Sequence, residues 1–454
     1  MTCSDFSGAE LSGHEPFLLQ ARIPDGHPQF LASDLFQDHR APQPKGDAHA
    51  IIATPPLAFA VRRRDPEFVG PAAPTPGETK RLSDIDDQGT LRGHVSFALV
   101  YRGRVPEDGD VAQGDPVSVI RRALGEALVH YYPLAGRLRE VKGRKLVVDC
   151  TGEGVLFVEA DADVTRLLCG GLVLTLRLNH TICDAIGIAQ FLNAVAEFGR
   201  GLPVPTVAPA WSRDLLEARS PPSPSFPHRE YNHVPLPPPP PSAADDDMVM
   251  RSFTFTSADI AAIKKRLPPL LRDTATSFEV LTASLWRART EALEIPPGQD
   301  AWLVFIANFR AFPELSLPAG YYGNACVPPT ALTDAATLRH GSIGDAMALV
   351  RQAKATVTAE YVRSTLDVLV LRGRPCLAVH NVFAVSDNRH AGFSRVDFGW
   401  GKPVYGGPAD TIFGVGFFVA AKDRDGKDVV VVPIVLPRPA MERFAAEVGK
   451  LCKA

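Results

Sequence analysis

A histidine and an aspartate four residues apart stand where the sequence pattern changes from strand to helix. Leucines occupy every second position from Leu172 to Leu178, and this alternation predicts a half-buried strand. His180 keeps the parity of the leucines, so its ring is expected in the same apolar space. Apolar residues then recur at helical spacing up to Phe198, and Asp184 precedes them, where a carboxylate can cap free backbone N–H groups. A rigidly held imidazole can act as a general base, because imidazole titrates near neutral pH.

These residues also have plainer interpretations. A lone histidine beside a strand is more often a packing residue, and an aspartate at a helix start is more often only a cap. Metal binding through His180, Cys183 and Asp184 is disfavoured, because no second ligand pair at zinc-like spacing is present in the sequence. We therefore predict no metal site.

Composition favours a cytoplasmic protein of two domains. The chain has 454 residues, of which 45% are hydrophobic and 22% charged, as is typical of globular proteins. The net charge of -3 gives no reason to expect a nucleic-acid or anionic membrane partner. Seven scattered cysteines favour reduced thiols in the cytosol, and we expect neither a signal peptide nor a membrane span.

Three motifs carry a family resemblance. H-T-I-C-D at 180–184 resembles the H-x-x-x-D motif of the BAHD plant acyl-CoA-dependent acyltransferases, although five residues alone are a weak signal. D-F-G-W-G at 397–401 matches the second motif of that family in full and follows in the expected order. Y-Y-P-L-A-G-R at 131–137 is similar to a further family segment. The resemblance runs from about Pro56 to Leu451.

The resemblance implies a fold and a reaction. It implies two α/β domains of similar size with mixed sheets, of the chloramphenicol acetyltransferase-like type, with a channel between them. Acyl-CoA would enter as co-substrate from one side and a small alcohol from the other, with no permanently bound cofactor and with the chain as a monomer. Within the family, the chain looks most like the alcohol (benzyl alcohol-type) O-acyltransferases. The expected organisation is a poorly ordered N-terminal extension at 1–55, a first domain at 56–220, a Pro-rich linker at 221–247 and a second domain at 248–454. The Pro-rich stretch 221–241 is expected to be exposed.

The same resemblance assigns roles within the site. It makes His180 the general base and places the Trp400 indole N–H, a donor without acceptor function, near the reaction centre. Asp184 would point away from the substrate and pair with an arginine, for which Arg310 is the candidate. Structural support of the loop around Trp400 is expected from Asp397, Gly399 and Gly401. No residue is singled out for CoA binding.

The chain departs from the family pattern at Asp161–Cys169. This stretch joins two pieces that related enzymes separate by a connector and a strand. The backbone groups of the strand at 172–178 must then face water, another element or a partner chain, and its leucine face would lose cover. Hence one hypothesis is a catalytically impaired member of the family, or a silent binding protein, because of the gap near Val164.

Three other functions compete with alcohol acyl transfer. A hydroxycinnamoyl or amine N-acyltransferase of the same family is a rival, as is a peptide-synthetase condensation domain, although Asn179 stands where that domain has a second histidine. A hydride-transfer enzyme is disfavoured, because no G-x-G-x-x-G follows a strand.

Periodicity predicts a strand over 57–61, a hairpin of 144–150 with 155–159, and one helix over 343–361.

Overall fold

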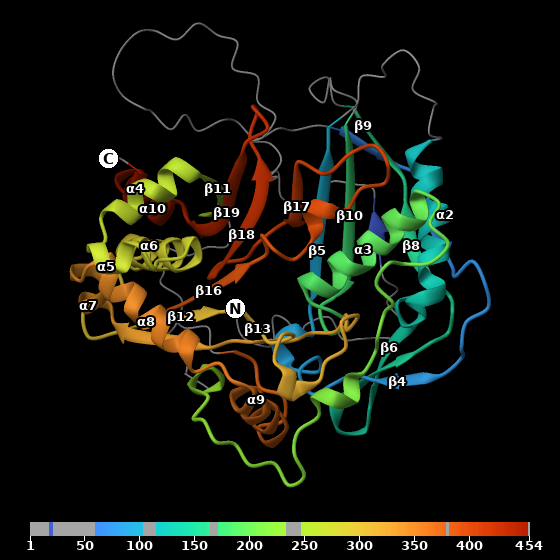
Figure 1. The fold of residues 1–454 in the computed structure, drawn as a ribbon, viewed down its shortest axis with the longest axis horizontal. Helices are drawn as coiled ribbons and strands as arrows, with labels where there is room; N and C mark the ends of the chain where they lie inside the picture. Colours follow the sequence, from blue (N-terminus) through green and yellow to red (C-terminus); the bar gives the residue numbers. More distant parts are fainter. Residues whose placement is uncertain are drawn as a thin grey trace, which may run out of the picture.

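Two sets of mixed strands and helices, one from each half of the chain, lie side by side in the fold (Figure 1). The structure is a computed structural model, and the residues that it describes are 18–20, 60–102, 115–163, 171–232, 247–377 and 381–452. The expected two-domain α/β fold with mixed sheets is therefore confirmed. The exact domain limits remain a prediction, since one sheet continues through both halves.

The first half supplies strands, two long helices and a strand from the N-terminal extension. The elements are β1 (Leu18–Gln20), β2 (Ala60–Arg63), β3 (Glu67–Val69), β4 (Thr79–Arg81), β5 (His94–Tyr101), α2 (Pro116–His130), β6 (Arg137–Val141), β7 (Lys145–Asp149), β8 (Val155–Val158), β9 (Ala160–Asp163), β10 (Leu172–Asn179) and α3 (Ala185–Gly199). Asp115 caps α2, which has Pro116 in its first turn, and Asp184 caps α3 as the sequence predicts.

The second half adds a larger set of helices around its strands. The elements are β11 (Met248–Thr256), α4 (Ser257–Lys265), α5 (Pro269–Arg272), α6 (Ser277–Ala292), β12 (Asp300–Phe305), β13 (Ala307–Asn308), β14 (Cys326–Val327), β15 (Thr330–Asp334), α7 (Ala335–His340), α8 (Ile343–Ala355), α9 (Ala359–Leu371), β16 (Val382–Asp387), β17 (Tyr405–Pro408), β18 (Val415–Lys422), β19 (Asp428–Pro437) and α10 (Arg438–Cys452). Capping boxes begin α4, α6 and α8.

A continuous sheet joins the two halves. Its strand order is β15-β12-β16-β18-β17-β5-β10-β1-β8-β3, and β19 pairs with both β18 and β11. The join is made by β17, a second-half strand that pairs antiparallel with β5. Phe393 and Phe398, which precede β17, pack in the apolar core of the first half together with α2 and α3. The loop that carries the second motif therefore belongs spatially to the first domain.

The strand that carries the first motif is paired on both edges. Along one edge, β10 pairs antiparallel with β5 over its whole length. Along the other, it pairs with β1, so another element takes up backbone groups that the apparent gap leaves without a neighbour. The expectation that the leucine face would lose cover is wrong, since Leu174, Leu176 and Leu178 are only 2%, 5% and 2% exposed. Apart from β1, the predicted poorly ordered extension 1–55 lies outside the described residues.

Several local expectations need correction. The predicted hairpin does not form, because β7 pairs with β4 and β6 whereas β8 pairs with β1 and β3; alternation fixes the faces of a strand but not its partners. The single helix predicted over 343–361 is two helices, because the Thr358 side chain accepts from the Tyr361 N–H and starts α9. The first predicted strand is shifted to β2, and residues 57–59 lie outside the described part.

The described part of the Pro-rich stretch is exposed over much of its length but is tied to α9 through buried residues. Within residues 221–232, His228 is buried and its Nε2 lies 2.8 Å from the Ser364 Oγ of α9. The Ser225 N–H donates to the same hydroxyl at 2.9 Å. The expected exposure therefore holds for seven of the twelve residues 221–232, among them Pro221, Pro224 and Pro227, and is wrong for the buried residues His228, Glu230 and Tyr231. Residues 233–246 lie outside the described part.

Two further observations bear on the sequence expectations. None of the helices in the described ranges is long and apolar enough to cross a membrane. Cys150, Cys183, Cys326 and Cys452 are free thiols, whereas Cys376 is disulfide-bonded, so the expectation of reduced cysteines is wrong for Cys376.

Candidate active site

His180 lies directly after β10, at the point where the chain leaves the sheet. Its backbone N–H donates to the Gly93 carbonyl at 2.9 Å, which continues the pairing of β10 with the segment before β5. The side chain is half-buried, and its Nδ1 is buried without a hydrogen-bond partner among the described residues. The backbone of His180 is thus fixed, while its ring takes part in no hydrogen bond with the described part of the protein.

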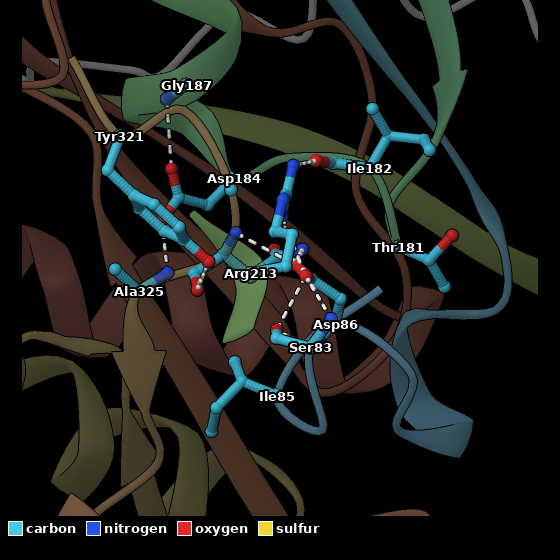
Figure 2. A network of polar contacts seen from close by, with 12 residues as sticks. Ser83, Ile85, Asp86, Thr181, Ile182, Asp184, Gly187, Arg213, Tyr321 and Ala325 are labelled. Atoms are coloured by element: carbon cyan, nitrogen blue, oxygen red, sulfur yellow. Dashed lines mark hydrogen bonds and ion pairs between the residues drawn. The ribbon is translucent and has the colours of Figure 1, made fainter. Parts of the chain in front are cut away.

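The turn that follows is held through its own carbonyl groups. The Asn324 Nδ2 donates to the His180 carbonyl at 2.9 Å. The Arg213 Nη2 donates to the Ile182 carbonyl at 2.6 Å (Figure 2). Within the turn, the Thr181 hydroxyl and N–H donate to the Asn179 Oδ1 at 2.7 and 3.1 Å. Because these donors and acceptors are buried or partly buried, each hydrogen bond offsets the cost of removing them from water and so stabilises the turn.

Asp184 uses both carboxylate oxygens inside the protein. Its Oδ1 accepts from the Ile186 and Gly187 N–H groups at 3.1 and 3.0 Å, and its Oδ2 accepts from the Ala325 N–H at 3.0 Å. Arg310 adds a bidentate pair, with 2.8 Å from each terminal nitrogen to one carboxylate oxygen. The Cys326 thiol, 3.4 Å from Oδ2, is a sixth donor. Six donors exceed the roughly four lone-pair sites of a carboxylate, so Asp184 has no acceptor capacity left for His180. The predicted partner, Arg310, is therefore the residue that the structure places against Asp184.

Electrostatics keep the Asp184–Arg310 pair ionised. Burial by itself would raise the pKa of the Asp184 carboxyl, but the Arg310 guanidinium and the backbone N–H donors outweigh it and hold this pKa below its usual range. Burial likewise opposes the charge on Arg310, yet Asp184 keeps the Arg310 pKa above its usual range. The pair thus remains charged near neutral pH.

A second, more deeply buried ion pair lies beside the first. The Arg213 Nη1 donates to both oxygens of Asp86 at 2.7 Å, and the two side chains are 2% and 0% exposed. Asp86 also accepts from the Ser83 N–H and hydroxyl at 3.0 and 2.6 Å. The Asn324 N–H and Nδ2 donate to the Asp86 Oδ1 at 3.0 and 2.8 Å. Burial opposes the charge on Arg213, but Asp86 keeps the pKa of Arg213 above its usual range.

Sequence reasoning missed Asp86, Arg213 and Asn324. Asp86 stands in an acid-rich connector, and Asn324 stands in a Gly-rich turn, both of which look like ordinary surface segments. Their partners are far away in sequence: 127 positions separate Asp86 from Arg213, and 238 separate it from Asn324. Periodicity within one sequence carries no signal for such pairs.

The second motif forms a loop that braces itself. The Asp397 Oδ1 accepts from the Gly399 and Gly401 N–H groups at 2.8 and 3.0 Å. Both glycines have positive φ, 104° and 105°. The Trp400 ring stacks on Phe398, with 5.1 Å between ring centroids and 15° between ring planes. The Trp400 Nε1 is buried without a hydrogen-bond partner among the described residues.

The predicted site residues fall into two groups. Arg310 pairs with Asp184, which ends the turn that His180 begins, and Asp397 pairs with the N–H groups of Gly399 and Gly401 on either side of Trp400. Across the described ranges, no hydrogen bond or ring contact joins Trp400 to His180. Nor do those ranges hold a group of three or more metal-ligating side chains.

Comparisons with known proteins place the chain in a family. A model described as Transferase family matches residues 59–167 and 162–451, two segments that meet within the region of the apparent gap. The benzyl alcohol O-benzoyltransferase of Petunia hybrida is 44% identical over 441 residues, covering 87% of this chain and 95% of the relative. Alcohol acyl transferase 1, allele GSa, of Malus domestica is 43% identical over 440 residues, with the same coverage of 87% and 95%.

Solved structures confirm the fold. Vinorine synthase aligns with a TM-score of 0.65 at 22% identity, covering 86% of this chain and 98% of that structure. TRI101 of F. graminearum, in complex with coenzyme A and deoxynivalenol, aligns with a TM-score of 0.64 at 14% identity, covering 82% and 98%. With the family model and the 44% identical relative, these results show that the chain belongs to the BAHD family of acyl-CoA-dependent acyltransferases, in which the two relatives named above are alcohol O-acyltransferases.

Proposed function

We propose that this chain transfers an acyl group from acyl-CoA to the hydroxyl of a small alcohol, with His180 as the general base. One observation carries the proposal: the backbone around His180 is tied by hydrogen bonds, while its ring has no partner among the described residues. A structural histidine would be expected to spend its ring nitrogens on protein groups, as buried His228 does.

The reaction needs few protein groups. His180 takes the proton of the alcohol as its oxygen attacks the thioester carbonyl, and a tetrahedral oxyanion forms. The C–S bond then breaks, and the CoA thiolate takes the proton back from His180, which leaves an ester and free CoA. No covalent enzyme intermediate is required, because the thioester is already activated. A positioned base of this kind is worth roughly 10²–10⁴ in rate.

Asp184 supports this base from a distance. Its oxygens are occupied by Arg310 and by backbone N–H groups, so it contributes the position of the turn and not a charge on the imidazole. Since Nδ1 is the buried ring nitrogen, we assign proton transfer to the Nε2 of His180.

Trp400 is proposed as a donor to the developing oxyanion. An indole N–H can only donate, and the Nε1 of Trp400 is buried without an acceptor in the described part of the protein. Stacking on Phe398 and the Asp397 brace fix the orientation of the ring. A donor aligned in advance lowers the barrier without reorganisation during the reaction.

The names of similar proteins support the substrate class. Benzyl alcohol is named for the relative in Petunia hybrida, and coenzyme A is named in the TRI101 complex. We therefore propose an acyl-CoA donor, benzyl alcohol or a similarly small alcohol as acceptor, and a monomeric, cytoplasmic enzyme.

Steady-state kinetics with benzoyl-CoA and benzyl alcohol test the base. His180→Ala is expected to lower kcat by about 10²–10⁴, while the melting temperature and the binding of CoA stay near wild type. His340→Ala, at the exposed end of α7, is the matched control and is expected to leave kcat unchanged. Near-normal turnover by His180→Ala would overturn the assignment.

A second variant tests the donor. Trp400→Phe keeps an aromatic ring for stacking but removes the indole N–H. We expect kcat to fall by about tenfold or more, with little change in the KM for benzoyl-CoA. An unchanged kcat would remove Trp400 from the mechanism and leave His180 unaffected.

A further inference from the structure

We propose that Leu18–Gln20, strand β1, is a surrogate strand: a piece of the N-terminal extension that completes the catalytic sheet in place of the segment missing near Asp161–Cys169. The observation is its position. It runs antiparallel to β10 and parallel to β8, between the strand that leads to His180 and the outer strands of the first half.

The pairing ends close to the proposed base. Leu18 lies opposite Arg177, Leu19 opposite Leu176 and Gln20 opposite Thr175. The paired stretch of β10 therefore ends at Arg177, three residues before His180. On its other edge, β10 is already fully paired with β5, from Leu172 opposite Tyr101 to Asn179 opposite His94. The surrogate strand thus covers the middle of the edge that β5 leaves open, at residues 175–177.

The surrogate strand is also the link between two parts of the sheet. Within the described residues, β8 reaches β10 only through β1, and β3 is attached only through β8. Without β1, the sheet would end at β10, and the N–H and C=O groups along that edge would lose their partners. Unpaired edge groups exchange with water, bind other strands or weaken the packing of the strand that carries them.

The position of β1 in the sequence supports its role as a replacement for the missing segment. The family match covers residues 59–167 and 162–451, so β1 lies outside it, and the two matched segments meet at the place of the apparent gap. The strand β1 and the segment missing from the family match therefore belong to the same edge of β10. This assignment concerns the fold and does not depend on the proposed acyl transfer.

Attachment through backbone hydrogen bonds makes a specific prediction. A strand added to a sheet edge is held mainly by its main chain, so a short peptide of the same sequence can take its place. We therefore expect the edge of β10 to accept residues 14–24 as a separate peptide when the chain's own copy is removed.

Hydrogen exchange of the full chain tests the pairing locally. Leu19→Pro removes a backbone N–H and is not tolerated in a central strand, whereas Leu19→Val keeps the N–H and the strand propensity. Exchange in 172–179 is expected to accelerate by about tenfold in Leu19→Pro and to stay unchanged in Leu19→Val. Exchange in 428–437, within β19, should be unchanged in both variants. Equal protection of 172–179 in all three proteins would overturn the surrogate strand.

Peptide addition covers the case in which a variant unfolds. The chain lacking residues 1–24, and Leu19→Pro, are each refolded with a peptide of residues 14–24 or with the same peptide carrying proline at position 19. Recovery of protection in 172–179 with the first peptide only supports the proposal, and equal results with both peptides overturn it. A dimer that restores protection by exchanging the strand between two copies would also overturn the intramolecular arrangement.

Discussion

The two motif loops are fixed in different ways. The turn from His180 to Asp184 is tied to distant parts of the chain: Arg213 in the first half, and Asn324 and Arg310 in the second. The loop around Trp400 is braced by its own residue, since Asp397 accepts from N–H groups two and four positions ahead. The difference teaches that the position of His180 depends on side chains from both halves of the molecule. The Trp400 turn is closed by Asp397, and its start is tied to the first half, where Arg200 donates to the Asp397 carbonyl and the Tyr101 hydroxyl donates to the Val396 carbonyl.

Burial separates the two regions further. Asp86 and Arg213 are 0% and 2% exposed, whereas the Gly401 end of the other loop is at the surface. A buried ion pair is weak evidence of net stabilisation, because desolvation of the charges offsets their attraction. Removing one partner is nevertheless costly, because the other charge stays buried without compensation. Perturbing the His180 turn should therefore cost stability, and perturbing the Trp400 loop should mainly cost activity.

The largest expected effect follows from removing Arg213. Arg213→Met leaves the Asp86 carboxylate buried without its ion-pair partner and the Ile182 carbonyl without a donor. We expect the free energy of unfolding to fall by about 3–5 kcal/mol, measured by urea denaturation. Lys450→Met, which breaks an exposed pair with Glu447, is the matched control and should cost at most about 1 kcal/mol.

A double-mutant cycle sharpens the same comparison. If Asp86 and Arg213 act as one unit, Asp86→Asn combined with Arg213→Met should cost less than the sum of the single changes. Additive losses, or a loss in Arg213→Met no larger than in Lys450→Met, would show that the turn is not held by this pair.

The next effect is pH-dependent. Asp184→Asn loses the charge that faces Arg310, and we expect a loss of about 2–3 kcal/mol near neutral pH. The folded pKa of Asp184 lies below its ordinary value of 3.8, so its stabilising contribution is fully present above that value. It is lost as the pH falls through the folded pKa, where the wild-type carboxyl takes up a proton.

Melting curves of wild type and Asp184→Asn at several pH values check this sign. The difference in melting temperature between wild type and Asp184→Asn should be constant from about pH 5 to pH 8 and should become smaller below about pH 4. A difference in melting temperature that grows on acidification would contradict the lowered pKa of Asp184. Loss of activity at unchanged stability would mean that Asp184 acts directly in the chemistry.

A smaller effect on stability is expected at Asp397. Asp397→Ala removes the acceptor for the Gly399 and Gly401 N–H groups, of which the second is near the surface and can turn to water. We expect a loss of about 1 kcal/mol in stability and a larger relative loss in kcat, because Trp400 loses its fixed orientation. A fall in stability as large as in Arg213→Met would remove the distinction between the two loops.

How far the sequence predicts this arrangement depends on the range of each interaction. Alternation and helical spacing are local, so β10, α3 and the cap at Asp184 could be read directly from them. The Asp184–Arg310 pair required the family resemblance, because 126 positions separate the two residues. The Asp86 pair and the surrogate strand carry no local pattern. The break before α9 was missed because the cap at Thr358 interrupts an otherwise continuous apolar period.

The smallest expected effect tests whether the Trp400 loop is local. Gly401 has a φ of 105°, a conformation that side chains disfavour, but a Cβ added there would meet no atom within 4 Å. Gly401→Ala therefore introduces backbone strain without a collision, and an exposed loop can relax part of it. We expect a loss of at most about 1 kcal/mol in unfolding free energy. Because relaxation moves the neighbouring indole, kcat should fall while protection of 172–179 from hydrogen exchange stays at the wild-type level. Faster exchange in 172–179 would instead mean that the two motif loops are mechanically coupled, which the separate hydrogen-bond sets do not predict.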